Sequence, residues 1–510
     1  MQERRRLSSL FFQRLTVAGL IILQTVLIIY TVVSRSRSSQ LFGILMTVIS
    51  FFVALHIASQ PRKTTYKVTW IFLILTFPLF GGLMYLLLYL QTSKKRLRSA
   101  FLSKETLYRL RCCPGDAMNQ LCEQAPEHLQ LVRYLQDHAG YPVYSGTQTR
   151  HLSPGEAAFP IILEELEKAE NYIFLEFFIV QEGVMWNSIL TILKRKAAQG
   201  VKVRLLYDDI GCFLLLPREY PQALRKYGIE CITFNPFRPL LTATQNNRDH
   251  RKVLIIDGKT AFTGGINLSD EYINVYEKHG YWKDSCLLLH GKAAWSLTMT
   301  FLEMWQICSG QKESPKVFFP PELNSADCSD GFVQPFADSP IDEEYVSEYV
   351  FLQMIHNAKD YLYINTPYLA INETMMTALS LASKSGVDVR IVTPHIWDKK
   401  IVHMTTRSYY KELLNAGVRV YEYTPGFMHS KLMVSDDSSA VIGTINLDFR
   451  SLYLHFECGV LLRNSAAVME AKEDFLRTLN DCHRITPADC KGSVLTSLKT
   501  AALRLLAPLM

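Results

Sequence analysis

The sequence predicts an α/β protein in which two duplicated domains, each a sheet flanked by helices, follow an N-terminal transmembrane helical region. Three observations support this prediction. Apolar runs concentrate before residue 95, strand and helix patterns alternate after residue 140, and the second half of the chain repeats blocks of the first. The chain has 510 residues, more than one hydrophobic core usually serves, so several structural units are expected.

Three apolar runs occupy residues 1–95, which we expect to anchor the chain in a membrane. They are Leu15–Val33, Leu41–Ala58 and Trp70–Leu90. The first run carries no charge over 19 residues, enough to cross a hydrocarbon core of about 30 Å. Buried core helices and a cleaved signal peptide are the alternatives. Three successive runs with basic flanks disfavour both.

Basic residues on both sides of the apolar region predict its orientation. Arg4, Arg5, Arg6 and Arg14 precede it, and Lys94, Lys95, Arg96 and Arg98 follow it. The positive-inside rule therefore places both ends in the cytoplasm. Three full crossings contradict this, whereas two crossings and a re-entrant third run, broken at Pro78 and Gly81-Gly82, satisfy it. We expect a multi-pass cell-membrane protein with its catalytic domains on the cytoplasmic side.

Beyond residue 140 the chain repeats itself in register. Three blocks recur: Lys168–Ile179 as Asn357–Leu369, Gly200–Asp209 as Gly386–His395, and Leu224–Phe234 as Leu413–Tyr423. A duplication of this length predicts two domains rather than a repeat array. In the first copy, 159–166 and 189–197 have helical spacing, while 172–180 and 201–207 resemble buried strands.

The composition shifts suggest domain boundaries. We expect a connecting segment over 96–140, the first domain over 141–325, the second over 326–485 and an amphipathic tail over 486–510. The Pro/Ser/Asp-rich stretch from Ser309 to Glu344 is expected to link the two domains. The tail has apolar residues on one helical face and either lies in the membrane interface or packs on the core.

One motif occurs once in each copy. In the first it comprises His250, Lys252, Asp257, Gly264, Gly265 and Asn267. In the second it comprises His429, Lys431, Asp436, Gly443, Thr444 and Asn446 at the same spacing. A lone His-x-Lys pair is commonplace. Its recurrence with Asp, Gly and Asn on two copies of one scaffold predicts a shared active site.

The spacing of the motif suggests how it handles an anion. On a strand, residues i and i+2 share a face, so we expect His250 and Lys252, like His429 and Lys431, to project together toward one phosphate. Asn267 and Asn446 follow a Gly-containing turn and are expected to return an amide to the same site. If the domains meet face to face, both copies surround one phosphate.

Four carboxylates accompany the motif. We include Asp257 and Asp436 in the catalytic set, although their odd spacing from the histidines indicates structural anchors, in salt bridges or otherwise. A carboxylate that orients each imidazole should come from another strand. Asp284 and Glu457, each at the start of an apolar strand, are the candidates, and we group them with Asn267 and Asn446 as substrate-binding residues.

The doubled His-x-Lys-x4-Asp pattern resembles the phospholipase D superfamily. Longer sequence segments resemble bacterial cardiolipin synthases. The segments concerned are "EFFI", "RLLYDDIG", "NNRDHRK", "FTGGINLSDEYIN", "GYWKD", "YTPGFMHSK" and "GTINLDFRS". The resemblance extends over nearly the whole chain; Thr444, where Ser is commoner, is a small departure that keeps the hydroxyl. It implies two phospholipase D-like domains with the site on the pseudo-twofold axis between them.

The resemblance also implies a reaction: a phosphatidyl group moves from one phosphatidylglycerol to another, giving cardiolipin and glycerol. One imidazole would form a phosphohistidine and the other would act as acid and base. By analogy His250 is the nucleophile and His429 the acid/base; the residues themselves leave that order open. The lysines would neutralise the phosphate, so we expect no metal and no cofactor.

Three other hypotheses about function compete with cardiolipin synthesis. The first is a related membrane phospholipase D or a phosphatidyltransferase with another acceptor: water, another alcohol or phosphatidylethanolamine. The second is a nuclease or a nucleic-acid-binding member of the superfamily. The membrane runs and the lack of a strongly basic, aromatic-interleaved face disfavour it. The third is a non-catalytic scaffold, which the intact motifs disfavour. We therefore expect phosphatidylglycerol, other anionic phospholipids and the bilayer as partners, and no nucleic acid.

The bulk composition is compatible with these expectations. Hydrophobic residues make up 48% and charged residues 20%, a globular composition with an apolar surplus. The net charge of +6 suits an anionic membrane surface or substrate. The eleven cysteines form no CxxC pair, which predicts free thiols in a reducing compartment and no structural zinc site.

Overall fold

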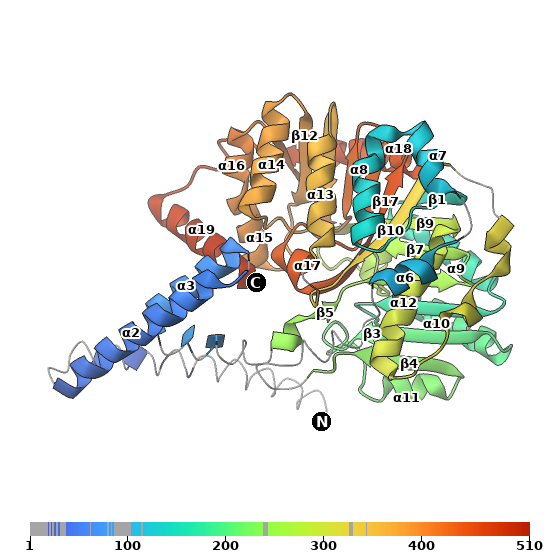
Figure 1. The fold of residues 1–510 in the computed structure, drawn as a ribbon, viewed down its shortest axis with the longest axis horizontal. Coiled ribbons are helices and arrows are strands. Elements are labelled where there is room, and N and C mark those ends of the chain that lie inside the picture. The colour runs from blue at the N-terminus through green and yellow to red at the C-terminus, as the bar shows by residue number, and fades with distance from the viewer. Residues whose placement is uncertain are drawn as a thin grey trace.

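The architecture is described from a computed structural model. The described residues are 19, 22, 25–26, 29–30, 37–61, 63–78, 81–82, 84–85, 104–113, 116–237, 243–325, 330–342 and 344–509. Two mixed sheets with helices on their faces form a body, from which an arm made by the first helices projects (Figure 1). The predicted run Leu15–Val33 lies largely outside the described residues.

The first sheet has the strand order β1-β9-β7-β6-β2-β3-β4. Its central strands are buried along their whole length, as the apolar runs in the sequence predict. Its strands are β1 (Thr147–Leu152), β2 (Tyr172–Phe177), β3 (Lys202–Asp208), β4 (Ile229–Phe234), β6 (Lys252–Ile256), β7 (Thr260–Gly264) and β9 (Cys286–Gly291).

The second sheet repeats this order as β10-β17-β16-β15-β11-β12-β13 and adds β18 at its edge. Each strand corresponds to one in the first sheet, which confirms the predicted duplication and the α/β class. Its strands are β10 (Phe332–Asp338), β11 (Tyr361–Asn365), β12 (Asp388–Pro394), β13 (Arg419–Tyr423), β15 (Leu432–Ser435), β16 (Ser439–Gly443), β17 (His455–Arg463) and β18 (Cys482–Arg484). The predicted linker Ser309–Glu344 therefore contains β10, a strand of this sheet.

Helices cover both faces of each sheet. In the first half they are α9 (Gly155–Glu167), α10 (Val184–Ala198), α11 (Tyr220–Arg225) and α12 (Ala293–Ser309). In the second they are α13 (Val346–Asn357), α14 (Glu373–Lys384), α15 (Lys400–Ser408), α16 (Tyr410–Asn415), α17 (Phe449–Tyr453) and α18 (Ala466–Thr478). The connecting segment forms α6 (Lys104–Arg111), α7 (Ala117–Gln124) and α8 (Leu129–Arg133).

The two halves exchange contacts symmetrically. Helix α12 packs on the first sheet and on β10 of the second, while α18 packs on the second sheet and on β1 of the first. Two short strand pairs also cross the boundary: β5 (Arg248–Asp249) with β17, and β8 (Tyr281–Lys283) with β14 (Gly426–Met428). Both cross-boundary pairs are parallel. They align the ends of the strands that carry the motif residues.

The arm consists of α2 (Arg37–Ser59) and α3 (Thr64–Thr76). Within the described residues, one helix, Gln40–Ser59, has the length and mean hydropathy to cross a membrane, and only 11% of its apolar window is buried. A core helix of a soluble protein would be covered, so this exposure favours a lipid-facing role. It coincides with the second predicted run.

The third predicted run does not form one long helix. Helix α3 has 13 residues, which gives a length of about 20 Å, shorter than a hydrocarbon core of about 30 Å. Beyond Phe77 the chain folds back, since it brings the ring of Tyr85 edge to face against that of Trp70, with centroids 5.5 Å apart. The break at Pro78 and Gly81 thus coincides with a change of chain direction.

The C-terminal tail forms α19 (Val494–Leu506) and the turn η8 (Ala507–Leu509). Helix α19 packs on α15 and on α3, and the Thr69 hydroxyl donates to the Leu505 carbonyl at 2.8 Å. Its other face exposes Val494, Leu495 and Leu498. The tail therefore both packs on the body and presents an apolar face beside the arm.

Candidate active site

His250 is positioned by a strand pair that crosses the domain boundary. In the β5–β17 pair, Arg248 lies opposite His455 and Asp249 opposite Phe456. The next residues along this register are His250 and Glu457. The His250 amide donates to the Phe456 carbonyl at 2.9 Å, and His250 Nδ1 lies 2.9 and 3.1 Å from the two carboxylate oxygens of Glu457.

His429 is positioned in the same way from the other side. In the β14–β8 pair, Met428 lies opposite Lys283, which brings His429 opposite Asp284. The His429 amide donates to the Lys283 carbonyl at 2.8 Å, and His429 Nδ1 lies 2.6 Å from Asp284 Oδ2. Each histidine therefore takes its carboxylate from the opposite domain.

Asp284 and Glu457 were grouped above with the substrate-binding residues and named as candidates to orient the imidazoles. Both are fully buried behind the imidazoles, and neither lines the cavity. Their carboxylates bond the imidazoles, which corrects the substrate-binding assignment. A carboxylate at Nδ1 accepts its N–H and leaves the Nε2 lone pair available.

The electrostatics of the site follow from burial. Burial, reinforced by Lys252 and Lys431, lowers the pKa of both His250 and His429 well below the ordinary histidine value. Burial raises the pKa of Asp284 to about 7. Both imidazoles are therefore neutral at pH 7 in the absence of substrate, the form in which a ring nitrogen can attack phosphorus.

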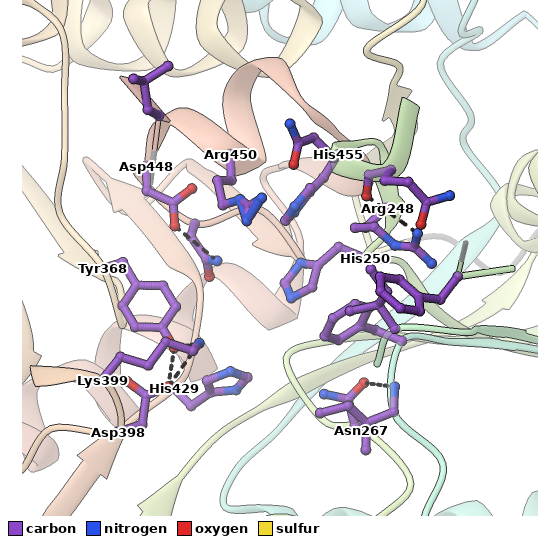
Figure 2. Close-up of a pocket in the computed structure, with 18 of the residues that line it drawn as sticks. Arg248, His250, Asn267, Tyr368, Asp398, Lys399, His429, Asp448, Arg450 and His455 are labelled. Carbon is purple, nitrogen blue, oxygen red and sulfur yellow. Dashed lines mark hydrogen bonds and ion pairs between the residues drawn. The ribbon is translucent and has the colours of Figure 1, made fainter. Parts of the chain in front are cut away.

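A cavity of about 940 Å³ contains both histidines. Polar side chains from both halves surround them (Figure 2). At another part of its wall the cavity is lined by Trp70 and Leu73 of α3, by Gly81 and Met84 of the segment after it, and by Leu509 of the C-terminal turn. The cavity therefore extends from the two histidines to apolar residues of α3, of the segment after it and of η8.

The two lysines do not project beside the histidines as the strand spacing predicts. His250 and His429 lie between strands, at the junctions β5–β6 and β14–β15. The Lys252 ammonium donates to the His250 carbonyl at 2.6 Å, and Lys431 donates to that of His429. Both lysines are buried and neither lines the cavity. Burial lowers their pKa, to about 8 for Lys252 and about 7 for Lys431.

Asp257 and Asp436 lie at the opposite ends of β6 and β15 from the histidines and do not line the cavity. Asp257 accepts backbone N–H bonds from Glu170, Asn171 and Tyr172 at 2.7–2.8 Å. Asp436 accepts the equivalent three bonds from residues 359–361 at 2.9–3.0 Å. This geometry corrects their place in the catalytic set: they anchor the start of β2 and β11 through backbone amides rather than salt bridges.

Asn267 and Asn446 both line the cavity. The Asn267 amide donates to the Tyr272 hydroxyl at 2.7 Å, and its oxygen accepts from the Ile179 N–H at 3.0 Å. Asn446 Oδ1 is buried and has no hydrogen-bond partner in the part of the chain that the structure describes. That oxygen is free to accept from a substrate hydroxyl.

The Gly-Gly and Gly-Thr dipeptides of the two motifs support the carboxylates. A Cβ added at Gly265 would lie 1.9 Å from Asp284 Oδ1, so only glycine leaves room for that carboxylate. At the equivalent position the Thr444 hydroxyl donates to Glu457. The departure at Thr444 therefore keeps the hydroxyl in use.

The sequence reasoning missed two aromatic neighbours of the histidines. The Trp282 ring packs 5.1 Å from that of His429, and the His455 ring lies 5.6 Å from that of His250. Both precede the orienting carboxylates by two residues, so the shared-face rule that was applied to His-x-Lys would have found them. Ligand atoms of His250, His455 and Glu457 lie within 4.8 Å of one another and are close enough to hold a metal ion.

A family model described as "Cardiolipin synthase, PLD-like domain" matches residues 162–300 and again 351–479. A cardiolipin synthase of a Geobacillus species is 38% identical over 447 residues, which cover 87% of this chain and 88% of that protein. This chain belongs to the cardiolipin synthase family. An uncharacterized protein of Streptococcus mutans serotype c is 39% identical over 462 residues, 89% of this chain and 99% of that protein.

Membership of the cardiolipin synthase family makes the chain a phosphatidyltransferase of the phospholipase D type and implies membrane association. A second model, described as "Phospholipase_D-nuclease N-terminal", matches residues 47–88. Among solved structures, phosphatidylserine synthase of Haemophilus influenzae aligns with 75% of this chain and 100% of that chain, with a TM-score of 0.56. At 14% identity this likeness shows the fold alone.

Proposed function

We propose that the enzyme transfers a phosphatidyl group from one phosphatidylglycerol to the primary hydroxyl of another, giving cardiolipin and glycerol. One observation carries the proposal: the cavity that contains both histidines is also lined by Trp70 and Leu73 of α3 and by Met84 after it. A lipid can keep its acyl chains against this apolar wall while its phosphodiester reaches the imidazoles.

The first chemical step uses His250 as nucleophile. Glu457 at Nδ1 directs the other ring nitrogen to phosphorus. A P–N bond forms and the P–O bond to the departing glycerol breaks, with His429 donating a proton to that oxygen. The anionic phosphodiester raises the pKa of a nearby imidazole, which allows the otherwise neutral His429 to hold this proton.

The second step reverses the roles. The primary hydroxyl of the acceptor lipid gives its proton to His429 and attacks phosphorus. The P–N bond breaks, His250 is restored and cardiolipin leaves. The assignment of nucleophile and acid/base rests on the family analogy, since the two histidines have equivalent surroundings.

We propose that the reaction needs no metal ion. The buried ammonium groups of Lys252 and Lys431 lie directly behind the histidines through their bonds to the His250 and His429 carbonyls. When both are protonated, these two groups in a water-poor site stabilise the extra charge of the pentacoordinate transition state. The lysines would thus act through the electrostatic field and not through a direct phosphate contact.

A transferase must favour a lipid hydroxyl over water, which competes at a concentration of about 55 M as the bulk solvent. An enzyme held at the bilayer meets headgroups at high local concentration. The apolar wall near α3 and η8 limits the access of water on that side. Both features favour transfer over hydrolysis.

The proposal is tested by product analysis with the purified full-length protein in vesicles containing phosphatidylglycerol. We expect cardiolipin and free glycerol in equal amounts, with phosphatidic acid a minor product, and no turnover by His250→Ala or His429→Ala. Dominant phosphatidic acid would make the protein a phospholipase D. A requirement for phosphatidylethanolamine would retain the mechanism and change the substrate pair.

We also propose a multi-pass arrangement with both catalytic halves on the cytoplasmic side. The basic flanks of the apolar region and the short, turned-back α3 support it. A reporter fused after residue 98 should read as cytoplasmic. An external reading would overturn the orientation without affecting the proposed chemistry.

A further inference from the structure

The two halves of the cavity differ at one pair of equivalent positions. Four residues after Asn267 the first copy has Glu271, and four residues after Asn446 the second has Arg450. Both side chains line the cavity. The pseudo-twofold symmetry of the motif is therefore broken by opposite charges on the two sides of the histidines.

Glu271 already has partners. It accepts from the Ser269 hydroxyl and lies 3.9 Å from the Lys278 ammonium. It is buried, so its side of the cavity is unfavourable for a second anion. A neutral polyol such as the glycerol leaving group suits that side better.

Arg450 is different. Its Nε is buried and has no hydrogen-bond partner within the described part of the chain. Burial is the main reason that its pKa is lowered. The nearest carboxylate along the chain, Asp448, caps α17 by accepting the Ser451 N–H at 2.8 Å. Its charge acts on Arg450, but the two side chains form no ion pair. The guanidinium lies between Asp448 and His455 at the cavity wall (Figure 2).

The other cationic side chains around the cavity form ion pairs with carboxylates. Arg248 binds Asp208 at 2.8 Å, and Lys399 lies 3.2 Å from Asp398. Among the lysines and arginines that line the cavity in the described residues, Arg450 alone has no ion pair. A partly buried guanidinium with an unpaired, buried Nε and no ion pair can bind an anion with several acceptor oxygens.

The position of Arg450 in the fold indicates which anion it binds. It belongs to α17, and α17 contacts η8, whose Leu509 lines the apolar part of the cavity with Trp70. The helix that carries Arg450 therefore adjoins the apolar part of the cavity, from which a lipid would approach under the proposed function. An acceptor phosphatidylglycerol that extends its glycerol toward the histidines leaves its own phosphate on this side.

We propose that Arg450 binds the phosphate of the acceptor lipid and so selects an anionic phospholipid as the second substrate. This inference rests on the proposed function, because it requires a lipid acceptor. It adds to the histidine site a second anion site used only in the transfer half of the reaction, and it explains why Glu271 and Arg450 differ in charge.

The test is a competition between two acceptors for the same donor. Full-length protein in phosphatidylglycerol vesicles is given a fixed concentration of ethanol, and cardiolipin and phosphatidylethanol are measured together. Both products arise from the same donor step, so effects on folding and donor binding cancel in their ratio. Arg450→Gln should lower the cardiolipin-to-phosphatidylethanol ratio at least about tenfold, because only the lipid acceptor loses a charge-assisted contact.

Two further variants make the result decisive. Lys399→Gln, which removes a paired cavity cation, should keep the ratio within about twofold. Arg450→Lys keeps the charge but loses the planar guanidinium that binds phosphate with two hydrogen bonds. Its cardiolipin-to-phosphatidylethanol ratio should therefore lie between those of the native chain and Arg450→Gln. An unchanged ratio in Arg450→Gln would overturn the proposal. If that variant makes neither product, an unchanged ratio in Arg450→Lys overturns it instead.

The outcomes for the native chain separate this inference from the proposed function. Phosphatidylethanol without any cardiolipin would reject cardiolipin synthesis whatever the variants do. Cardiolipin formation with a ratio that does not depend on Arg450 would reject only the acceptor site.

Discussion

Replacing Asp284 by Asn tests whether a carboxylate from one domain controls the histidine of the other. The change preserves the shape of the side chain but removes the charge that accepts the His429 Nδ1–H at 2.6 Å. An amide can instead donate to Nδ1, which places the imidazole proton on Nε2 and blocks its use as a base. Glu457→Gln should act in the same way on His250.

The size of the effect follows from two contributions. Hydrogen bonds to charged groups contribute about 1.5–3 kcal/mol, and each 1.36 kcal/mol changes a rate about tenfold, so loss of the bond alone lowers kcat by about 10- to 150-fold. Inversion of the imidazole tautomer lowers kcat further. Replacing the triad aspartate of a serine protease by Asn, which has the same effect on its histidine, lowers kcat about 10⁴-fold.

The assay is cardiolipin formation at varied phosphatidylglycerol content, with thermal unfolding of each variant. A positioning role predicts a lower kcat with KM changed by less than about threefold. Asp436→Asn is the matched control, because it makes the same chemical change outside the cavity; it should lower the unfolding temperature and leave kcat within about twofold. If Asp284→Asn kept more than about half of the native kcat, the cross-domain pairing would not contribute to catalysis.

Three other outcomes follow from the site. Gly265→Ala should lower kcat as Asp284→Asn does, because the added Cβ would meet the Asp284 carboxylate; native activity in this variant would show that the carboxylate can move. As pH rises through about 7 to 8, Lys431 and Lys252 lose their protons, so kcat/KM should fall in a pH–rate profile. Stability should rise over the same range, because the unfolded chain binds more protons there than the folded one does; a kcat/KM that climbs to pH 9 would contradict the role of the lysines. EDTA should leave the rate in vesicles within about twofold, whereas full loss restored by one divalent ion would indicate a metal at His250, His455 and Glu457.

Much of this arrangement could be predicted from the sequence because it is periodic or duplicated. Alternating strand and helix patterns and in-register repeats predict the two α/β units, and identical spacing predicts the shared site. The spacing of a motif, however, reports distances along one strand. It could not show that His250 and His429 lie at strand junctions, where each lysine turns back to its histidine carbonyl.

Contacts between the two halves could not be predicted from local sequence patterns. The parallel pairing of β5 with β17 and of β8 with β14 is a long-range feature, and it determines which carboxylate meets which imidazole. Asp284 and Glu457 could be named as candidates from their place before apolar strands. Their crossed partnership, and the opposite charges of Glu271 and Arg450, become meaningful only when both halves are seen around one cavity.

The most direct test of the two-histidine account is to trap the covalent intermediate on a predicted residue. A donor lipid with a nitrophenyl leaving group needs no proton to depart, so His429→Ala should still form the phosphohistidine. Without a base for the acceptor, that variant should release a single equivalent of nitrophenolate in a burst and carry the phosphatidyl group on His250, as peptide mapping would show. His250→Ala should give no burst. A burst from His250→Ala with the adduct on His429 would reverse the assignment, and no adduct in either variant would contradict a covalent mechanism.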